Sequence, residues 1–451
     1  MDNLWKKETT QNQTGYIDLF ASLQEDDVWN DGATNPLETI TFRKDNEKSL
    51  ESRTRGNEIF AAKNWEDAME HYNQSLRNAE VGSENVALAY SNRSACFFYM
   101  QMYDEALVDI ELAKKENLPY RLLPKLQERR QKCLELANTV QRMPEYQPKL
   151  DYEPNKQFPC LANLVKIEQN DEFGRYLVAN SDIPKGKTIL LEEHFAVSHI
   201  EDFSICYTCY RATFSNYLAC EHCTNVMFCS VECKNRNKTH EWECGTFFGM
   251  RFFNDVKIQK FLHRTRLIVQ TILTAVTTFP NVETLMQFVE NTLREDPDKL
   301  PTSMHDNVSK YHFFFKLKKR MVNPLDGVKR VYQWIMLLPK IRALFDNVEK
   351  QHFLMHLIAH HSLIVDTNSI GSKESSNVNI VFSMFNHCCE PNVKESSSEK
   401  ITYCTTSRPV KKGEQLFISY LSPDEMKLPK EKRQEKLRNA WGFVCKCKKC
   451  V

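Results

Sequence analysis

Most of the sixteen cysteines of this chain lie in short clusters, two to four residues apart. In a reducing compartment such spacing is typical of zinc ligands, whereas a small secreted chain would use cysteines as a disulfide framework. Four pairs between residues 206 and 244 predict two closed, structural zinc sites, although their spacing leaves the pairing open. The predicted ligands are Cys206, Cys209, Cys220, Cys223, Cys229, Cys233, His240 and Cys244.

A second cysteine group combines two distant stretches. The chain ends in FVCKCKKCV, which supplies Cys445, Cys447 and Cys450. Three cysteines make an incomplete tetrahedron, so a fourth ligand must come from elsewhere, and Cys388 or Cys389 in FNHCCEPNV is the candidate. Taken alone, FNHCCEPNV also fits a redox pair, a nucleophile beside its base, or a buried turn.

Composition restricts the class of protein that must position these residues. At 451 residues the chain is long enough for two to four domains of about 100–200 residues each. Lysine plus arginine number 60 and aspartate plus glutamate 59, so no basic bias indicates direct binding to nucleic acid or to a membrane. The N-terminus lacks the apolar core of a signal peptide, and no apolar run is long enough to span a bilayer. We therefore expect an intracellular, soluble protein, cytoplasmic and nuclear.

The order of segments predicts a multidomain α+β protein. A polar, flexible arm (1–45) precedes a repeated helical pattern (46–140), and a proline-containing linker (141–158) follows. The next part is β-type, with NLVKIEQ, GRYLVAN and KTILLEE before the cysteine cluster and NIVFSMF, ITYCTTS and QLFISYL far behind it. The predicted parts are 159–205, the cysteine cluster 206–244, a helical insertion 245–365, a second β part 366–428 and the terminal segment 429–451.

Two of these parts resemble known repeats and fingers. Small and aromatic residues recur with a period in the thirties, among them Gly56, Tyr72, Ala95 and Tyr103, and resemble tetratricopeptide (TPR) helix pairs. Residues 206–244 resemble the MYND zinc finger, a module that binds proteins. That resemblance implies interleaved pairs, with Cys206, Cys209, Cys229 and Cys233 on one zinc and Cys220, Cys223, His240 and Cys244 on the other. The finger is expected to have no real hydrophobic core, and His222 to be exposed rather than a ligand.

Motifs in the two β parts resemble one enzyme family. NHCCEPN is similar to the NHSCxPN motif of SET-domain methyltransferases, GEQLFISY to their GEELxxxY motif, and CKCKKC to the post-SET cysteines. With a finger inserted in the SET domain and TPR-like helices before it, the chain resembles the SMYD family of protein-lysine methyltransferases, nearest to its TPR-bearing type-four branch. The resemblance implies methyl transfer from S-adenosylmethionine to a lysine of a histone or non-histone protein, with a role in transcriptional regulation.

The resemblance also implies roles for single residues. Tyr420 matches the catalytic tyrosine, Cys389 completes a third zinc site, and Cys388 stands where the family has serine. The implied cofactor-binding residues are Gly174, Arg175, Tyr176, Asn368, Asn386, His387, Tyr420 and Phe443. The alternatives are a merely packed aromatic at Tyr420 and, for the whole protein, a zinc-stabilised adaptor without turnover.

A second site is predicted on the helical repeats. Two amides and three cations at helical spacing resemble the carboxylate clamp with which some TPR domains hold the C-terminal peptide of heat-shock chaperones. The alternative is a solvated charged face. The clamp residues are Arg53, Asn57, Asn92, Lys125 and Arg129.

Overall fold

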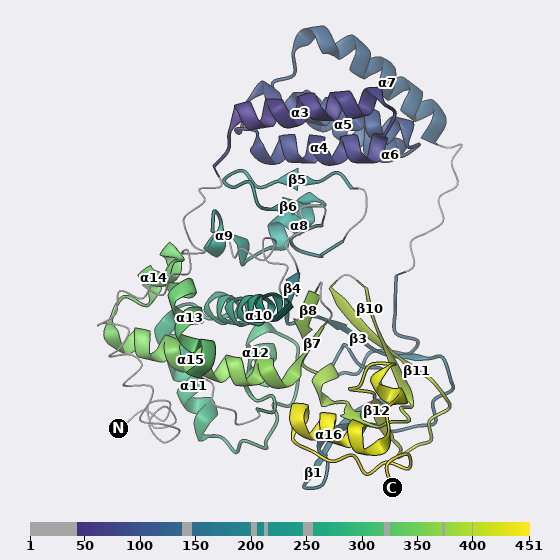
Figure 1. The fold of residues 1–451 in the computed structure, drawn as a ribbon, viewed down its shortest axis with the longest axis vertical. Coiled ribbons are helices and arrows are strands. Elements are labelled where there is room, and N and C mark those ends of the chain that lie inside the picture. Colours follow the sequence, from purple (N-terminus) through teal and green to yellow (C-terminus); the bar gives the residue numbers. More distant parts are fainter. Residues whose placement is uncertain are drawn as a thin grey trace. The chain divides into compact units, whose positions relative to one another are not determined.

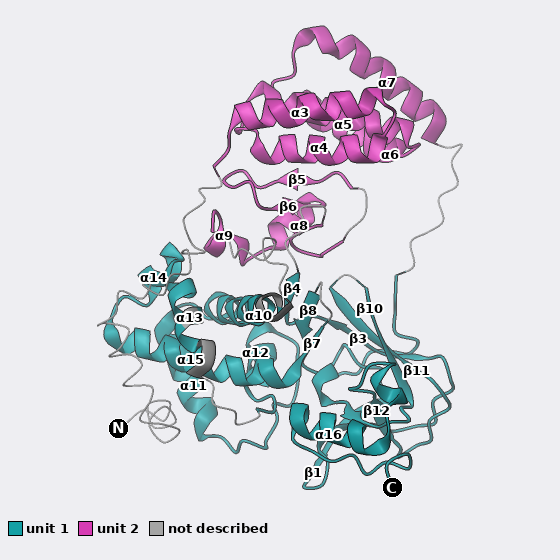
Figure 2. Cartoon of the chain, in the orientation of Figure 1, with its two compact units in different colours: residues 1–36, 147–200, 248–451 teal, residues 37–146, 201–247 magenta. Residues whose placement is uncertain are grey.

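The computed structural model describes residues 43–137, 147–199, 205–211, 215–246, 256–319, 325–371, 375–398 and 400–451, whose helices and strands are drawn in Figure 1. The chain divides into two compact units (Figure 2): residues 1–36, 147–200 and 248–451 form one, and residues 37–146 and 201–247 form the other. The predicted arm, 1–45, lies almost wholly outside the described residues. Of the described helices, none has the length and apolar character needed to cross a bilayer.

The helical part of the second unit consists of helices joined by short turns, as the repeated pattern predicts. Side chains start the first two helices: Asp45 accepts hydrogen bonds from the backbone N–H groups of Glu47 and Lys48, and Asn64 accepts one from Asp67. The helices are α3 (Asn46–Ala61), α4 (Trp65–Asn78), α5 (Glu84–Tyr99), α6 (Tyr103–Lys115) and α7 (Leu123–Leu136).

A glycine lets the first two of these helices approach closely. A Cβ atom at Gly56 would lie 2.7 Å from Cε1 of Tyr72, which itself is buried. Any larger residue at position 56 would therefore push α3 away from α4. Gly56 and Tyr72, two of the small and aromatic positions singled out in the sequence, serve this packing.

The cysteine-rich segment of the same unit contains little regular structure. A two-stranded sheet and two short helices carry or flank most of its predicted ligands. The Ser230 side chain accepts a hydrogen bond from the Cys233 backbone N–H at 3.1 Å and so starts the helix that holds Cys233. The elements are β5 (Leu218–Ala219), β6 (Met227–Phe228), α8 (Val231–Arg236) and α9 (His240–Glu243).

The described residues of the first unit form three small sheets, whose strands are drawn in the lower part of Figure 1. One has the order β1-β2-β12-β9, and its last pair, β12 and β9, is parallel. The second has the order β10-β11-β3 and the third β4-β8-β7, both antiparallel. The strands are β1 (Val165–Asn170), β2 (Gly174–Ala179), β3 (Thr188–Glu193), β4 (Ala196–His199), β7 (Ser369–Gly371), β8 (Ser375–Val378), β9 (Asn386–His387), β10 (Val393–Ser398), β11 (Ile401–Thr406) and β12 (Gln415–Ile418).

Helices form the predicted insertion between the two β parts. The last of them ends at Asn368, three residues beyond the predicted boundary at 365. Its histidines His356, His360 and His361 are buried, and among the described residues none of them belongs to a group that could hold a metal ion. The helices are α10 (Val256–Thr278), α11 (Val282–Arg294), α12 (Asn307–Phe315), α13 (Leu325–Met336), α14 (Pro339–Leu344) and α15 (Val348–Asn368); α16 (Lys430–Trp441) belongs to the terminal segment.

One predicted strand is wrong. The apolar run NIVFSMF (379–385) forms a buried turn that contains a short 3-10 helix, Phe382–Met384. The cause is the buried carboxylate of Glu192, which accepts hydrogen bonds from the backbone N–H groups of Ile380, Val381 and Phe382 at 2.8, 2.9 and 2.7 Å. Three consecutive N–H groups directed at one carboxylate are incompatible with the alternating pattern of a strand.

The predicted linker, 141–158, also needs correction. Its first residues, to 146, lie outside the described part of the chain, but the remainder packs on the first unit. The Asp151 carboxylate accepts a hydrogen bond from the Thr188 backbone N–H at 2.7 Å, and Asn155 donates to the Val165 carbonyl at 3.0 Å. Residues 147–158 are therefore part of this unit and not a free connection.

Candidate functional site

The finger cysteines gather into two groups of four. Within each group all ligand atoms lie within 4.8 Å of one another, and the pairing is the interleaved one that the family resemblance implies. His222 is exposed and outside both groups, as expected. The groups are Cys206, Cys209, Cys229 and Cys233, and Cys220, Cys223, His240 and Cys244.

A third group joins the middle of the chain to its C-terminal segment. Cys389 Sγ lies 3.5 Å from Cys450 Sγ, and Cys445 and Cys447 complete the set within the same 4.8 Å limit. Gly442, with a φ of +80°, ends α16 and turns the chain toward these cysteines. Cys388 is only half-buried and is not a member of this set, so Cys389 is the fourth ligand, as the resemblance implies.

All three groups fit zinc by the chemistry of their donors. Each offers four soft ligands, cysteine sulfur or histidine nitrogen, at a separation suited to one tetrahedral ion. Four protein ligands leave no open coordination position. The groups therefore fit structural zinc, as the sequence predicts, and not a metal that activates water.

The finger shares a hydrophobic core with the helical repeats, contrary to the expectation that it has none. Tyr217, Val226, Met227 and Phe228 are buried together with side chains of α4, α5, α6 and α7. The contributing helix residues are Leu76, Ala89, Tyr90, Ile110, Ala113 and Leu126. The face of the finger that carries these aromatic and aliphatic side chains is thus covered within the unit.

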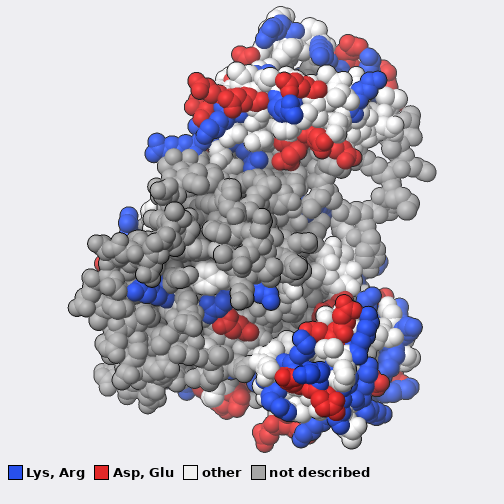
Figure 3. Space-filling view, viewed as in Figure 1, with Lys and Arg blue, Asp and Glu red and all other residues white. Residues whose placement is uncertain are grey.

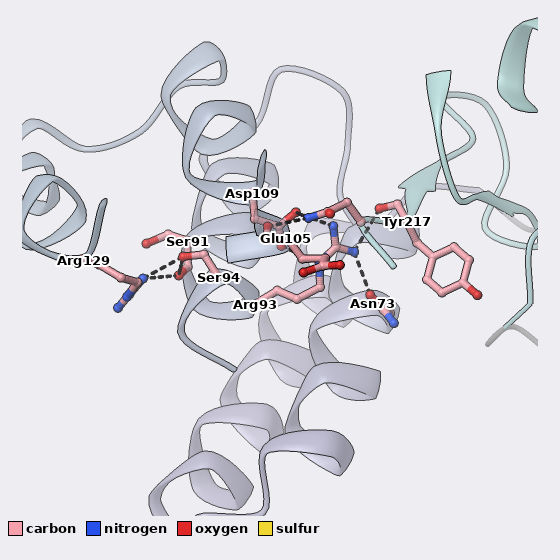
Figure 4. A network of polar contacts seen from close by, with 9 residues as sticks. Asn73, Ser91, Arg93, Ser94, Glu105, Asp109, Arg129 and Tyr217 are labelled. Atoms are coloured by element: carbon pink, nitrogen blue, oxygen red, sulfur yellow. Dashed lines mark hydrogen bonds and ion pairs between the residues drawn. The ribbon is translucent and has the colours of Figure 1, made fainter. Parts of the chain in front are cut away.

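A buried polar network fixes the same contact (Figure 4). Arg93 of α5 donates to both carboxylate oxygens of Asp109 at 2.7 and 2.8 Å, to Asn73 at 2.7 Å and to the Tyr217 carbonyl of the finger at 2.9 Å. Asn216 of the finger donates to Asp109 at 2.7 Å. Through these hydrogen bonds Arg93 connects α4, α5, α6 and the finger.

The candidate cofactor residues Asn386 and His387 form β9, beside β12. The Asn386 amide donates to the Phe173 carbonyl at 3.1 Å, which ties β9 to the turn that begins β2. In that turn Gly174 has a φ of +62°, a conformation that favours glycine. The structure therefore brings the GRY turn and the Asn-His motif together, although they lie over two hundred residues apart in sequence.

Tyr420 lies beside this strand and is held by two hydrogen bonds. Its hydroxyl donates to the Phe385 carbonyl at 2.6 Å, and its backbone N–H donates to His387 Nδ1 at 3.0 Å. Phe443 completes the aromatic surroundings, with ring centroids 6.2 Å from Tyr420 and 6.1 Å from His387. Burial raises the pKa of the Tyr420 phenol, so the hydroxyl keeps its proton at neutral pH.

His387 connects this aromatic group to the third cysteine group. Because Nδ1 accepts the Tyr420 N–H, the proton of the neutral ring is on Nε2, which lies 3.4 Å from Cys389 Sγ. A histidine that donates to a ligand sulfur belongs to the outer shell of the metal site. His387 therefore connects Tyr420 to the third cysteine group through one contact on each ring nitrogen.

Three predicted cofactor residues direct their side chains at protein groups. Arg175 donates to the carbonyls of Lys316 and Pro297, and Asn368 donates to those of Lys318 and Ile364. The Tyr176 hydroxyl lies between Asn170 and Glu168. For these three residues the side-chain part of the cofactor prediction has no support in the geometry.

Sequence reasoning missed the residues that support the site. Glu192 lies in an ordinary-looking strand, and Trp441, whose ring centroid is 5.0 Å from that of Tyr420, closes a highly charged helix. The only sequence signal was a lone tryptophan beside Phe443. Neither residue belongs to a motif quoted for the family.

The predicted peptide site lies on α3, α5 and α7. Asn57 Oδ1 accepts from Asn92 at 2.9 Å and from the Tyr72 hydroxyl at 3.0 Å, while Arg129 donates to the Ser91 carbonyl and the Ser94 hydroxyl at 2.8 and 2.7 Å (Figure 4). Burial lowers the pKa of both Arg53 and Arg129. No carboxylate of the described residues forms an ion pair with either guanidinium, and Lys125 is exposed.

The surface charge is mixed. On the face drawn in Figure 3, basic and acidic side chains of the described residues are interspersed, in accord with 60 basic and 59 acidic residues in the chain. The view shows no broad face of one sign.

The comparisons with known proteins agree with this geometry. The family model of the SET domain matches residues 174–421, which is 248 of the 451 residues and more than half of the chain. The chain therefore belongs to the SET-domain family. Its curated relatives are named SMYD4 or SET and MYND domain-containing proteins, which supports the SMYD resemblance that the motifs predicted.

The curated relatives are remote in sequence. A protein-lysine N-methyltransferase SMYD4 of Danio rerio is 24% identical over 46% of this chain and 30% of its own length. A SET and MYND domain-containing protein of Dictyostelium discoideum is 26% identical over 62% of this chain and 58% of its own. A SMYD4 of Mus musculus is 21% identical over 91% of this chain and 68% of its own. The chain thus spans less than two thirds of the first two relatives.

A solved structure was also similar. A crystal structure of the SET domain of LSMT bound to lysine and AdoHcy is 14% identical and covers 62% of this chain and 53% of that chain. The TM-score is 0.28, too low for a comparison of the two folds.

Proposed function

We propose that the protein is an S-adenosylmethionine-dependent protein-lysine N-methyltransferase. One observation carries this proposal: the Tyr420 hydroxyl is fixed on the Phe385 carbonyl, next to Asn386 and His387 and under Phe443. These residues come from three distant parts of the chain. A set of packed aromatics alone would not require a buried tyrosine hydroxyl directed at the residue before the Asn-His motif.

The residues present fit the cofactor. Its sulfonium carries a positive charge, and the rings of Tyr420 and Phe443 offer aromatic faces to a cation. Within the described part of the chain, Asn386 Oδ1 has no protein donor, so it is free to accept from the adenine amino group. When bound, the cofactor would supply an electrophilic methyl group for transfer from its sulfonium to the lysine amine, with the neutral thioether as leaving group, so no nucleophilic side chain is needed.

The protein's own task is to align a neutral lysine. Tyr420 remains a phenol because burial raises its pKa, so it does not act as a phenolate base. Its proton is engaged by the Phe385 carbonyl, which leaves the oxygen lone pairs to accept a hydrogen bond from the lysine amine. Removal of water from the lysine in this site disfavours its ammonium form by desolvation. Alignment and desolvation are thus the proposed catalytic contributions.

Zinc is proposed to stabilise this arrangement without contact with the reacting atoms. Three ions would occupy the three cysteine groups, two in the finger and one at the C-terminal segment. The third would fix Phe443, which precedes Cys445 by two residues, against Tyr420. We further propose that the finger is of the MYND type and the helical repeats of the TPR type, which would place the protein in the type-four branch.

The alternative is a zinc-stabilised adaptor without turnover, which the side-chain contacts of Arg175 and Asn368 favour. Equilibrium dialysis of the zinc-loaded protein with labelled S-adenosylmethionine distinguishes the two. The enzyme predicts saturable binding that is lost in Asn386→Ala and retained in Asn377→Ala, a matched asparagine on β8. Absence of binding by the zinc-loaded protein would reject the enzyme.

The helical repeats suggest a second function, the binding of an acidic C-terminal peptide such as that of a heat-shock chaperone. Two half-buried guanidinium groups, for which the described residues provide no carboxylate partner, and a pair of amides suit a terminal carboxylate. A peptide ending in Glu-Asp with a free carboxylate should bind, and its C-terminal amide should bind at least about tenfold more weakly. Lys125→Ala should weaken binding, whereas Lys132→Ala on the same helix should not. Equal binding of acid and amide would exclude the clamp.

The remaining expectations concern the setting of the protein. We propose histone or non-histone protein substrates, a role in transcriptional regulation, protein ligands for the finger, and a cytoplasmic and nuclear location. Because the apolar finger face is covered by the repeats, a ligand of the finger would have to use another face. Fluorescence microscopy and a comparison of methyl-lysine peptides with and without the gene test the location and the substrates.

A further inference from the structure

Arg433 of α16 is a buried arginine at the edge of the third cysteine group. Only 4% of the residue is exposed. Its Nη2 donates to Cys450 Sγ at 3.4 Å and to the Lys449 carbonyl at 3.0 Å, and its Nη1 donates to the Leu428 carbonyl at 2.7 Å. The guanidinium also interacts with Cys389.

No carboxylate accounts for the charge of this guanidinium. Among the described residues, none of the acidic side chains forms an ion pair with Arg433, and Nε has no hydrogen-bond partner. Burying a cation without a counter-charge is costly, and carbonyl groups carry only partial charges. The remaining groups around it are the sulfurs of the cysteine group. Their negative charge is the counter-charge that the buried arginine requires.

The negative charge would belong to a zinc–thiolate complex of known net charge. A zinc ion bound to four thiolates has a net charge of −2, and an outer-shell donor that offsets part of it favours the ionised ligands. The guanidinium of an arginine keeps its charge throughout the physiological pH range, so this offset is permanent. Arginine suits this position because its planar group can donate to a sulfur and two carbonyls at once.

We propose that Arg433 is the outer-shell counter-ion of the third zinc site and slows the release of that zinc. The inference rests on the zinc assignment of the proposed function and not on catalysis. By joining α16 to Cys389 and Cys450, Arg433 also fixes the segment that carries Phe443. It is a positioning residue and has no contact with the reacting atoms.

The test is the rate of zinc release from the full chain to a chromogenic chelator, recorded as the number of ions and the rate of each phase. Wild-type protein should release three ions. In Arg433→Met one of the three should leave about 10–100-fold faster, with a smaller acceleration in Arg433→Lys, which keeps the charge but loses the planar donors. Arg438→Met removes an exposed arginine of the same helix and should leave all three rates unchanged.

A variant that lacks the third zinc site shows whether the accelerated zinc release in Arg433→Met comes from that site. Cys447→Ser removes one ligand of that site and should leave a protein with two ions. In this background Arg433→Met should have no further effect on zinc release. Equal release rates in wild-type, Arg433→Lys and Arg433→Met would overturn the proposal, as would an effect that persists without Cys447. If Arg433→Met does not fold, Arg433→Lys alone decides the matter. Absence of methyl transfer by wild-type protein that releases three ions as expected would instead contradict the proposed enzyme and leave this proposal standing.

Discussion

Arg93 and Asp109 form an ion pair with no solvent-exposed surface on either side chain, at a distance of 2.7 Å between Nε and Oδ2. Removal of one partner from such a pair leaves an uncompensated buried charge. Because Arg93 also donates to the Tyr217 carbonyl, the pair determines how the finger packs on α4, α5 and α6. The helices and the finger should therefore unfold together.

Replacement of Arg93 by methionine should lower the free energy of unfolding of this unit by about 3–5 kcal/mol. Arg55→Met is the matched control, since Arg55 pairs with Glu58 at 2.9 Å with both side chains largely exposed. That change should cost less than about 1 kcal/mol. Urea unfolding of the zinc-loaded protein measures both, and equal costs would contradict the buried-pair argument.

Removal of the Tyr420 hydroxyl should reduce methyl transfer without loss of the cofactor. In Tyr420→Phe the ring stays in place but the lysine amine loses its acceptor, and we expect a rate roughly 10²–10³-fold lower with little change in S-adenosylmethionine affinity. Tyr403→Phe, on β11, serves as the control. Rates from a methyl-transfer assay and affinities from dialysis check this, and an unchanged rate would remove Tyr420 from the mechanism.

The carboxylate of Glu192 should hold the turn before the Asn-His motif. In Glu192→Gln the amide nitrogen would face a backbone N–H, and a buried unsatisfied donor costs about 1–3 kcal/mol. Glu193→Gln changes the neighbouring, more exposed residue, which pairs with Lys400 at 3.1 Å, and should have little effect. Hydrogen exchange of residues 380–382 should accelerate only in the Glu192 variant. Equal protection in both variants would show that the carboxylate does not hold the turn.

Acid should destabilise the helical insertion through its buried histidines. His361 lies between the Tyr311 and Thr271 hydroxyls, each at 3.0 Å, and burial lowers its pKa to about 3. Above pH 6.5 the ring is neutral in both the folded and the unfolded state, so protonation of His361 takes nothing from the free energy of unfolding. Below it only the unfolded state binds the proton, until the folded pKa is reached, and each such histidine costs about 1.4 kcal/mol per pH unit.

Urea unfolding at pH 7.5 and 5.5 measures this dependence. His361→Gln should lower stability at both values but reduce the loss between them by about 1.4 kcal/mol relative to wild type. His305→Gln removes an exposed histidine and should leave the loss unchanged. If His361→Gln loses as much unfolding free energy between pH 7.5 and 5.5 as the wild-type protein does, His361 is not the cause of the pH dependence.

Local patterns in the sequence predicted the parts that depend on local chemistry. The spacing of cysteines and of His240 identified eleven of the twelve members of the three groups, because ligand geometry restricts spacing directly, whereas the choice of Cys389 over Cys388 came from the family resemblance. Helical periodicity identified the repeats and the insertion. NIVFSMF was assigned wrongly because its conformation depends on Glu192, nearly two hundred residues away. The shared core of finger and repeats was missed for the same reason, since nothing near Tyr217 in sequence indicates Arg93.

The order of the chain has a consequence for synthesis on the ribosome. The repeats end with α7 at Leu136, but the finger that covers their apolar residues is complete only at Cys244, 108 residues later. At roughly 5–20 residues per second, translation leaves that surface uncovered for about 5–20 seconds. During this interval the nascent chain presents apolar surface of the kind that promotes aggregation.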